Sequence, residues 1–134
     1  MTKPLEVEGI GAANAQRLEN IGVASIEQLL RDGASPAGRR RLATESGIDE
    51  RKLLEWVNHA DLMRINGVGS EYSDLLEAAG VDSIPELANR NAENLHAKMA
   101  EVNAAKKLVR REPSLPETQR WIAEAKTLDR IVTH

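Results

Sequence analysis

Apolar residues recur along most of the chain at steps of three and four, which is the spacing of one face of an α-helix. The clearest stripe consists of Leu53, Trp56, Val57, Ala60 and Met63 and predicts a helix over about 50–64. No stretch alternates between apolar and polar residues for long enough to predict a strand. The other predicted helices cover about 12–20, 26–31, 36–47, 70–79, 92–106 and 115–128, with a short one beginning at 84. The pattern therefore predicts an all-α fold.

Short polar residues mark the starts of several predicted helices. Ser25, Ser83 and Ser114 are each followed three residues later by Gln or Glu, which is the pattern of a capping box. Ser35 directly precedes a proline, and proline is favoured at the first position of a helix. Pro113 disfavours helix at the residue before it, so the stretch that leads to this proline is expected to be extended.

Two glycine turns, Gly9-Ile10-Gly11 and Gly67-Val68-Gly69, lie 58 residues apart and open the two halves of the chain. The same offset aligns Ala15 with Ser73, Leu18 with Leu76, Gly22-Val23 with Gly80-Val81, Ser25-Ile26 with Ser83-Ile84, and Leu29 with Leu87. Self-similarity at a fixed offset is the signature of a repeated supersecondary unit. Trp121 corresponds to Trp56 at an offset of 65, so the second copy has about seven extra residues, which we place between 106 and 113.

The repeat predicts how the chain is organised. We expect two pseudo-repeats of about four helices each, covering about 5–64 and 65–130 and packed as one compact unit. Residues 1–134 would then form a single domain, with the stretch up to Glu8 as an extended lead-in.

Composition narrows the classes of function. The chain has 134 residues and no cysteine, which excludes disulfides, thiolate catalysis and cysteine-ligated metals. The net charge of −3 counts against a broad nucleic-acid-binding face and leaves room only for local basic patches. No apolar run approaches the roughly 18 residues of a membrane span, and the first residues lack the apolar core of a signal peptide. We therefore expect a cytoplasmic protein that does not bind a membrane.

Enzyme signatures are missing from the sequence. His59, His96 and His134 are not spaced as helical metal ligands, and neither a phosphate-binding loop nor a nucleophile elbow occurs. The carboxylates fall on amphipathic helices, with no isolated acid in an apolar run whose pKa burial would raise. We therefore expect no catalytic residues, no metal, no cofactor and no small-molecule substrate.

The repeated pattern of Gly-apolar-Gly, Ala or Ser, Leu, Gly-Val, Ser and Leu resembles the helix-hairpin-helix family, and the whole chain resembles small bacterial two-motif domains of unassigned function. The resemblance implies that each glycine turn grips a DNA phosphate with backbone N–H groups, without reading sequence. Helix N-termini favour anions for the same reason. DNA-binding members usually place Lys or Arg two residues after the second glycine, where this chain has Ala13 and Glu71.

The implied phosphate contacts fall on the two turns and on two basic clusters. At the first turn they are Gly9, Ile10, Gly11, Ala12 and Ala13, with Arg17 as the nearest cation, and at the second turn they are Gly67, Val68 and Gly69. The basic clusters are Arg39, Arg40 and Arg41, and Lys106 and Lys107 with Arg110 and Arg111. The first turn is the better candidate, because Glu71, Asp74 and Glu77 surround the second and would repel phosphate.

Two functions remain open at this point. The first is a non-catalytic module that binds duplex DNA without sequence preference, through the turns and the arginine clusters. The second is a protein–protein interaction or scaffolding module with no nucleic-acid role, in which both basic clusters are solvated helix ends that complement the helix dipole. The acidic residues at the second turn favour the second function, and the family resemblance favours the first.

Overall fold

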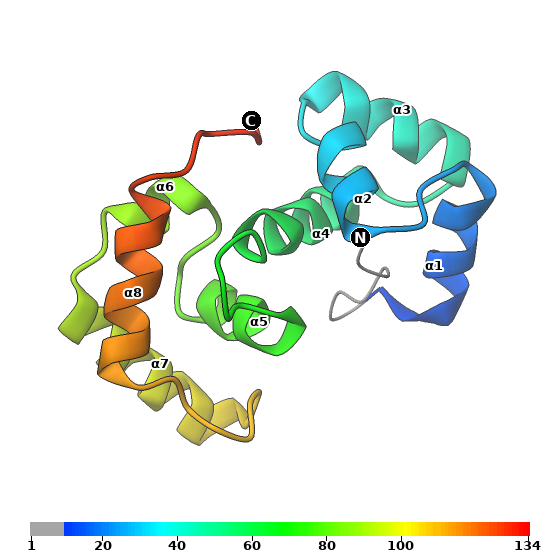
Figure 1. Cartoon of the computed structure of the whole chain (residues 1–134). Helices are drawn as coiled ribbons and strands as arrows, with labels where there is room; N and C mark the ends of the chain where they lie inside the picture. Colours follow the sequence, from blue (N-terminus) through cyan, green and yellow to red (C-terminus); the bar gives the residue numbers. More distant parts are fainter. Residues whose placement is uncertain (1–9) are drawn as a thin grey trace. The chain divides into compact units, whose positions relative to one another are not determined.

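The structure is a computed structural model that describes residues 10–134 (Figure 1). These residues form helices and no strands, which confirms the predicted all-α fold. The helices are α1 (Gly11–Asn20), α2 (Ile26–Asp32), α3 (Pro36–Ser46), α4 (Glu50–Leu62), α5 (Ser70–Ala78), α6 (Ile84–Ala88), α7 (Ala92–Lys106) and α8 (Leu115–Ala125). The lead-in predicted up to Glu8 lies outside the described residues.

The chain divides into two compact units. The first contains the residues up to Asp61 together with Ile131–His134, and the second contains Leu62–Arg130. The first unit therefore holds α1 to α3 and nearly all of α4, and the second holds α5 to α8. The division falls three residues before the boundary of 64 and 65 predicted for the repeats.

In the first unit, α3 packs against both α1 and α2. The buried apolar side chains of this unit include Leu18, Val23, Ile26, Leu29, Leu42, Ile48, Leu53, Trp56 and Val57. The last residues of the chain join this unit, because the Thr133 N–H donates to the Ala34 carbonyl at 2.8 Å. A segment remote in sequence thus completes the first unit.

In the second unit, α8 packs against α6 and α7, and α7 packs against α5 (Figure 1). The core of this unit is formed mainly by Leu62, Ile65, Val68, Leu75, Leu76, Val81, Ile84, Leu87, Leu95, Met99, Val102, Trp121 and Ile122. Helix α8 faces this core with Trp121, Ile122 and Ala125, all of which are buried.

The helices that follow the glycine turns end in the same way. In α1 the Val23 N–H donates to the Leu18 carbonyl at 2.9 Å and the Gly22 N–H to the Glu19 carbonyl at 3.0 Å, and Gly22 is left-handed at φ +90°. This is a Schellman motif. In α5 the same two bonds join residues 58 positions later, from Val81 to Leu76 and from Gly80 to Glu77, both at 2.9 Å. The two ends are consistent with the predicted repeat.

The serine N-caps are confirmed, with one difference. Ser25, Ser35, Ser83 and Ser114 each accept a hydrogen bond from a backbone N–H in the first turn of the helix that follows. Only Ser114 of these has the full reciprocal box, in which the Glu117 carboxylate also accepts from the Ser114 N–H. At Ser25 the Gln28 side chain accepts instead from the N–H of Ala24, and Glu86 likewise accepts from Asp82. These two bonds therefore hold the residue before the N-cap and do not complete the reciprocal box.

Two helices are shorter than predicted. Helix α4 ends at Leu62 instead of 64, because the Ile65 N–H turns back to the Leu62 carbonyl at 3.1 Å on the way into the second glycine turn. Helix α8 ends at Ala125 instead of 128, and the Thr127 and Leu128 N–H groups make tighter bonds to carbonyls three residues earlier. The apolar stripe continues past both ends, to Met63, which is buried, and to Leu128, which is half-buried, so it predicted burial better than helix length.

Candidate functional site

The two glycine turns open the two helices that begin without a side-chain cap. Helix α1 follows Ile10 and helix α5 follows Gly69, and neither N-cap residue accepts a hydrogen bond with its side chain. By contrast, α2, α3, α6, α7 and α8 each begin with a serine or asparagine side chain that accepts one. The N-cap residues of α1 and α5 therefore leave the first N–H groups of these helices without a capping bond of their own, which suits an anion.

The two turns differ in backbone conformation. In the second turn the first glycine, Gly67, is left-handed at φ +90°, and Gly69 is extended at φ −103°. In the first turn the second glycine, Gly11, is left-handed at φ +73°. Gly9 lies outside the described residues. Ile10 and Val68 are buried and anchor each turn, so only their backbones can serve as contacts.

Helix α8 holds the second turn in place. The Asn66 N–H donates to the Glu124 carboxylate at 3.1 Å. A Cβ atom at Gly67 would lie 3.4 Å from the indole nitrogen of Trp121, and the ring of Trp121 packs against that of Tyr72 with centroids 5.3 Å apart. Trp121 and Glu124 are one helical turn apart on the same face of α8, and this face therefore defines the shape of the turn.

A cleft of about 400 Å³ lies beside the second turn. One part of its wall is the turn and the start of α5, and the other part is the linker between α7 and α8. The lining residues are Gly67, Gly69, Ser70, Glu71, Tyr72, Arg110 and Arg111. The fold therefore places two cations beside the uncapped start of α5.

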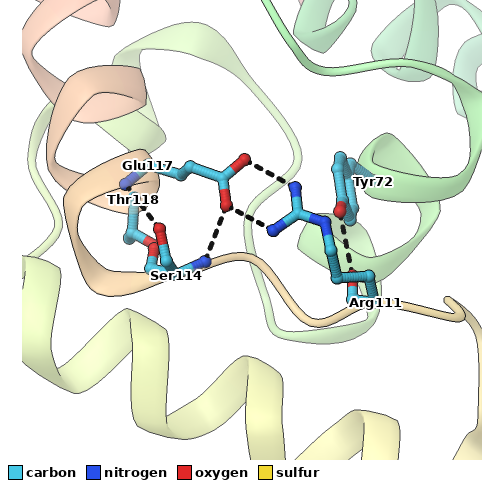
Figure 2. Close-up of polar contacts among 5 residues, drawn as sticks. All are labelled: Tyr72, Arg111, Ser114, Glu117 and Thr118. Carbon is cyan, nitrogen blue, oxygen red and sulfur yellow. Dashed lines mark hydrogen bonds and ion pairs between the residues drawn. The ribbon is translucent and has the colours of Figure 1, made fainter.

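The linker that carries these arginines is tied to both α5 and α8 (Figure 2). The Tyr72 hydroxyl donates to the Arg111 carbonyl at 2.9 Å. The Arg111 guanidinium donates to both carboxylate oxygens of Glu117, at 2.8 Å each. The Ser114 N–H donates to the same carboxylate at 2.9 Å and completes the capping box of α8. The position of the linker is thus fixed by contacts from two helices.

These bonds shift the titration of both partners. The hydrogen bonds from the Arg111 guanidinium and the Ser114 N–H lower the pKa of Glu117 to about 2. The Glu117 carboxylate in turn raises the pKa of Arg111. Both groups therefore stay charged at any physiological pH.

The cluster Arg39–Arg41 does not form one basic patch. Arg39 is only 4% exposed and its guanidinium donates to the carbonyls of Gly33, Ala34 and Thr133, at 2.9, 3.1 and 2.7 Å. Burial lowers its pKa, against the opposing charge of Glu50. The prediction that Arg39 contacts phosphate is therefore corrected, because its donors already serve the protein backbone.

The other predicted residues are accessible but separate. Arg40 is exposed, and the exposed Arg41 pairs with Glu45 at 3.3 Å on the same helix. Arg17, Ala12 and Ala13 are exposed along α1. Lys106 ends α7, and Lys107 is left-handed at φ +52° as its C-cap. Neither lysine lines the cleft at the second turn, although Arg110 and Arg111 of the same cluster do.

Sequence reasoning missed Ser70 and Tyr72, and it did not place Arg110 and Arg111 at the second turn. The available signal was the insertion of about seven residues between 106 and 113, because this insertion carries both arginines. The acidic residues that counted against the second turn are only partly relevant. Glu71 lines the cleft, whereas Asp74 and Glu77 do not.

Residues 8–128 match the family model described as "Domain of unknown function (DUF4332)", and the chain therefore belongs to that family. Neither a curated protein nor a solved structure matches the chain. Within the described residues, no helix has both the length and the apolar character needed to cross a bilayer.

Proposed function

We propose that this chain is a non-catalytic module that binds the phosphate backbone of duplex DNA at the second glycine turn, without reading base sequence. The observation that supports this proposal best is the single cleft that combines the uncapped start of α5 with Arg110 and Arg111. Backbone N–H groups and the positive end of the helix dipole favour a phosphate there. The resemblance to tandem helix-hairpin-helix proteins supports the same function, and a cytoplasmic location belongs to this proposal.

The second turn replaces the first as the preferred contact, because of where the cations lie. Arg110 lines the cleft of the second turn, whereas Arg39 is engaged by backbone carbonyls of the first unit. Glu71 lies in the same cleft and opposes phosphate, so a phosphate must approach from the side of the arginines. We therefore expect weak binding that is strongly dependent on salt, with a slope of about −0.9 in log K per phosphate neutralised.

The test compares Arg110→Glu with Arg120→Glu. Both residues are exposed cations of the second unit, and only Arg110 lines the cleft, so the two variants have the same net charge. Fluorescence anisotropy with a short labelled duplex at low salt should show a loss of about tenfold or more for Arg110→Glu and a much smaller loss for Arg120→Glu. Equal losses in the two variants would show that binding follows net charge alone and would overturn the proposed site.

The second candidate function is a protein–protein interaction module, and a different feature of the first unit favours it. A cleft of about 340 Å³ is lined by Leu30, Ala34 and Ile131, with Glu27 and Arg31 beside them. Ile131 is 40% exposed and is the exposed large apolar residue within residues 10–134. This function predicts that duplex DNA is not retarded at low salt in a gel-shift assay. It also predicts that the chain binds a second copy of itself or another protein, and that Ile131→Ser lowers the affinity of that binding. Sedimentation velocity of the unmodified chain and of Ile131→Ser tests self-association.

A further inference from the structure

Arg111 presents an unusual combination of exposure and pairing within the cleft. Its side chain is 65% exposed, but both terminal nitrogens of its guanidinium are engaged by Glu117, whose side chain is only 19% exposed. The pair is bidentate, with two parallel N–H···O bonds of 2.8 Å. This geometry is the one that a guanidinium also adopts with a phosphate group.

A phosphate entering the cleft would therefore meet only one uncompensated arginine. The Glu117 carboxylate offers Arg111 the same pair of acceptor oxygens that a phosphate would offer, and it is already in place. The low pKa of Glu117 keeps the carboxylate charged across the physiological range, so protonation does not release the arginine. Arg110 also lines the cleft, and among residues 10–134 it does not form a bidentate pair of this kind.

We propose that Glu117 is an intramolecular competitor that occupies the Arg111 guanidinium in place of a DNA phosphate and so limits the affinity of the second turn for DNA. This inference rests on the proposed function. The backbone of Arg111 is held separately, because its carbonyl accepts from the Tyr72 hydroxyl at 2.9 Å. Loss of the Glu117 charge would therefore free the guanidinium while the linker stays beside the cleft.

The capping box of α8 allows the charge of Glu117 to be removed without loss of the cap. Glu117 accepts from the Ser114 N–H as the third residue of the box, and Gln serves at this position as well as Glu. Glu117→Gln therefore removes the charge that holds Arg111 and keeps the start of α8. Glu112 is the matched control, because it is an exposed acid next to Arg111, and Glu112→Gln changes the net charge by the same amount.

Anisotropy titrations of the full chain with a short duplex at several salt concentrations test the inference. Glu117→Gln should bind about threefold to tenfold more tightly at low salt, with a salt slope steeper by about 0.9 for the one phosphate added. Glu112→Gln should keep the slope of the unmodified chain. Identical affinities and slopes for the two variants would overturn the inference and leave the proposed function standing.

A second variant keeps the test decisive if Glu117→Gln folds poorly. The double change Arg111→Gln with Glu117→Gln removes the whole ion pair without changing net charge. If Glu117 already neutralises Arg111, this variant keeps the salt slope of the unmodified chain. A salt slope shallower by about 0.9 would mean that Arg111 contacts phosphate despite Glu117, and it would overturn the inference. A chain that fails to bind duplex in every form at low salt would overturn the proposed function itself.

Discussion

The substitution Arg39→Met tests whether the buried arginine holds the end of the chain on the first unit. Arg39 donates to two carbonyls that follow α2, those of Gly33 and Ala34, and to the carbonyl of Thr133, which lies 94 positions after Arg39. Methionine has a similar length and suits an apolar site, but it donates no hydrogen bonds. The change therefore removes the donors and keeps most of the packing.

The expected magnitude follows from how exposed each acceptor is. A buried acceptor left without a partner costs about 1–3 kcal/mol, and an exposed acceptor costs much less because water replaces the donor. Gly33 is buried, Ala34 is partly buried and Thr133 is exposed, so one full penalty and part of a second apply. Removal of a buried charge returns part of the cost of its desolvation. We expect the free energy of unfolding of the first unit to fall by about 2–3 kcal/mol.

Hydrogen exchange measured by mass spectrometry follows the first unit separately from the second. In Arg39→Met, peptides from α3 and from the end of the chain should lose protection, because the Thr133 N–H donates to the Ala34 carbonyl at 2.8 Å only while the end is docked. Arg40→Met is the matched control, since Arg40 is the exposed neighbour on the same helix, and its effect should stay within about 0.5 kcal/mol. If both variants lost the same protection, the bonds to the three carbonyls would contribute nothing measurable and the reasoning would be refuted.

Two further predictions concern the second unit. Gly67→Ala should destabilise this unit by about 1–2 kcal/mol, because Gly67 has φ +90° and its Cβ would lie 3.4 Å from Trp121. Gly69→Ala should cost less, because Gly69 has φ −103° and open space around its Cβ. Thermal denaturation followed by circular dichroism measures both, and the reverse order of stability would contradict the argument. The pKa of Glu117 falls from its usual 4.5 to about 2 on folding, so its contribution to stability is present above pH 4.5 and is lost as the pH falls towards 2. Glu117→Gln should therefore be less sensitive to acid over this range in melts at stepped pH, and parallel curves for the two proteins would contradict the assigned pKa.

Under the proposed function, an acidic chain has to bind an anionic partner. The net charge is −3, so attraction to DNA cannot come from the protein as a whole. It has to come from Arg110 and the start of α5 at short range, within about 10 Å at moderate salt. This is why variants with matched charge, such as Arg110→Glu and Arg120→Glu, separate the site from the general field better than a salt titration alone.

Local sequence was enough to predict most of the helices and many of their ends. A serine cap needs only the residues within one turn of it, and Ser25, Ser35, Ser83 and Ser114 all cap as predicted. The Gly22 and Gly80 ends also depend on bonds that span only a few residues. The lengths of α4 and α8 were less predictable, because an apolar stripe continues into a buried turn in the same way as into a helix.

Where the charged side chains lie was decided by the tertiary structure. In the sequence Arg39 stands with Arg40 and Arg41, and nothing local shows that it is buried. The reason is that the Thr133 carbonyl, which accepts a hydrogen bond from the Arg39 guanidinium, is 94 residues away. In the sequence Arg110 and Arg111 likewise stand with the lysines that end α7. The fold places both arginines beside the second glycine turn, where the Tyr72 hydroxyl, 39 residues earlier, donates to the Arg111 carbonyl. The sequence alone therefore determined the helices, their caps and the paired glycine turns, since these depend on contacts within a few residues. Only the folded chain placed Arg110 and Arg111 beside the second turn, since that depends on contacts between distant segments.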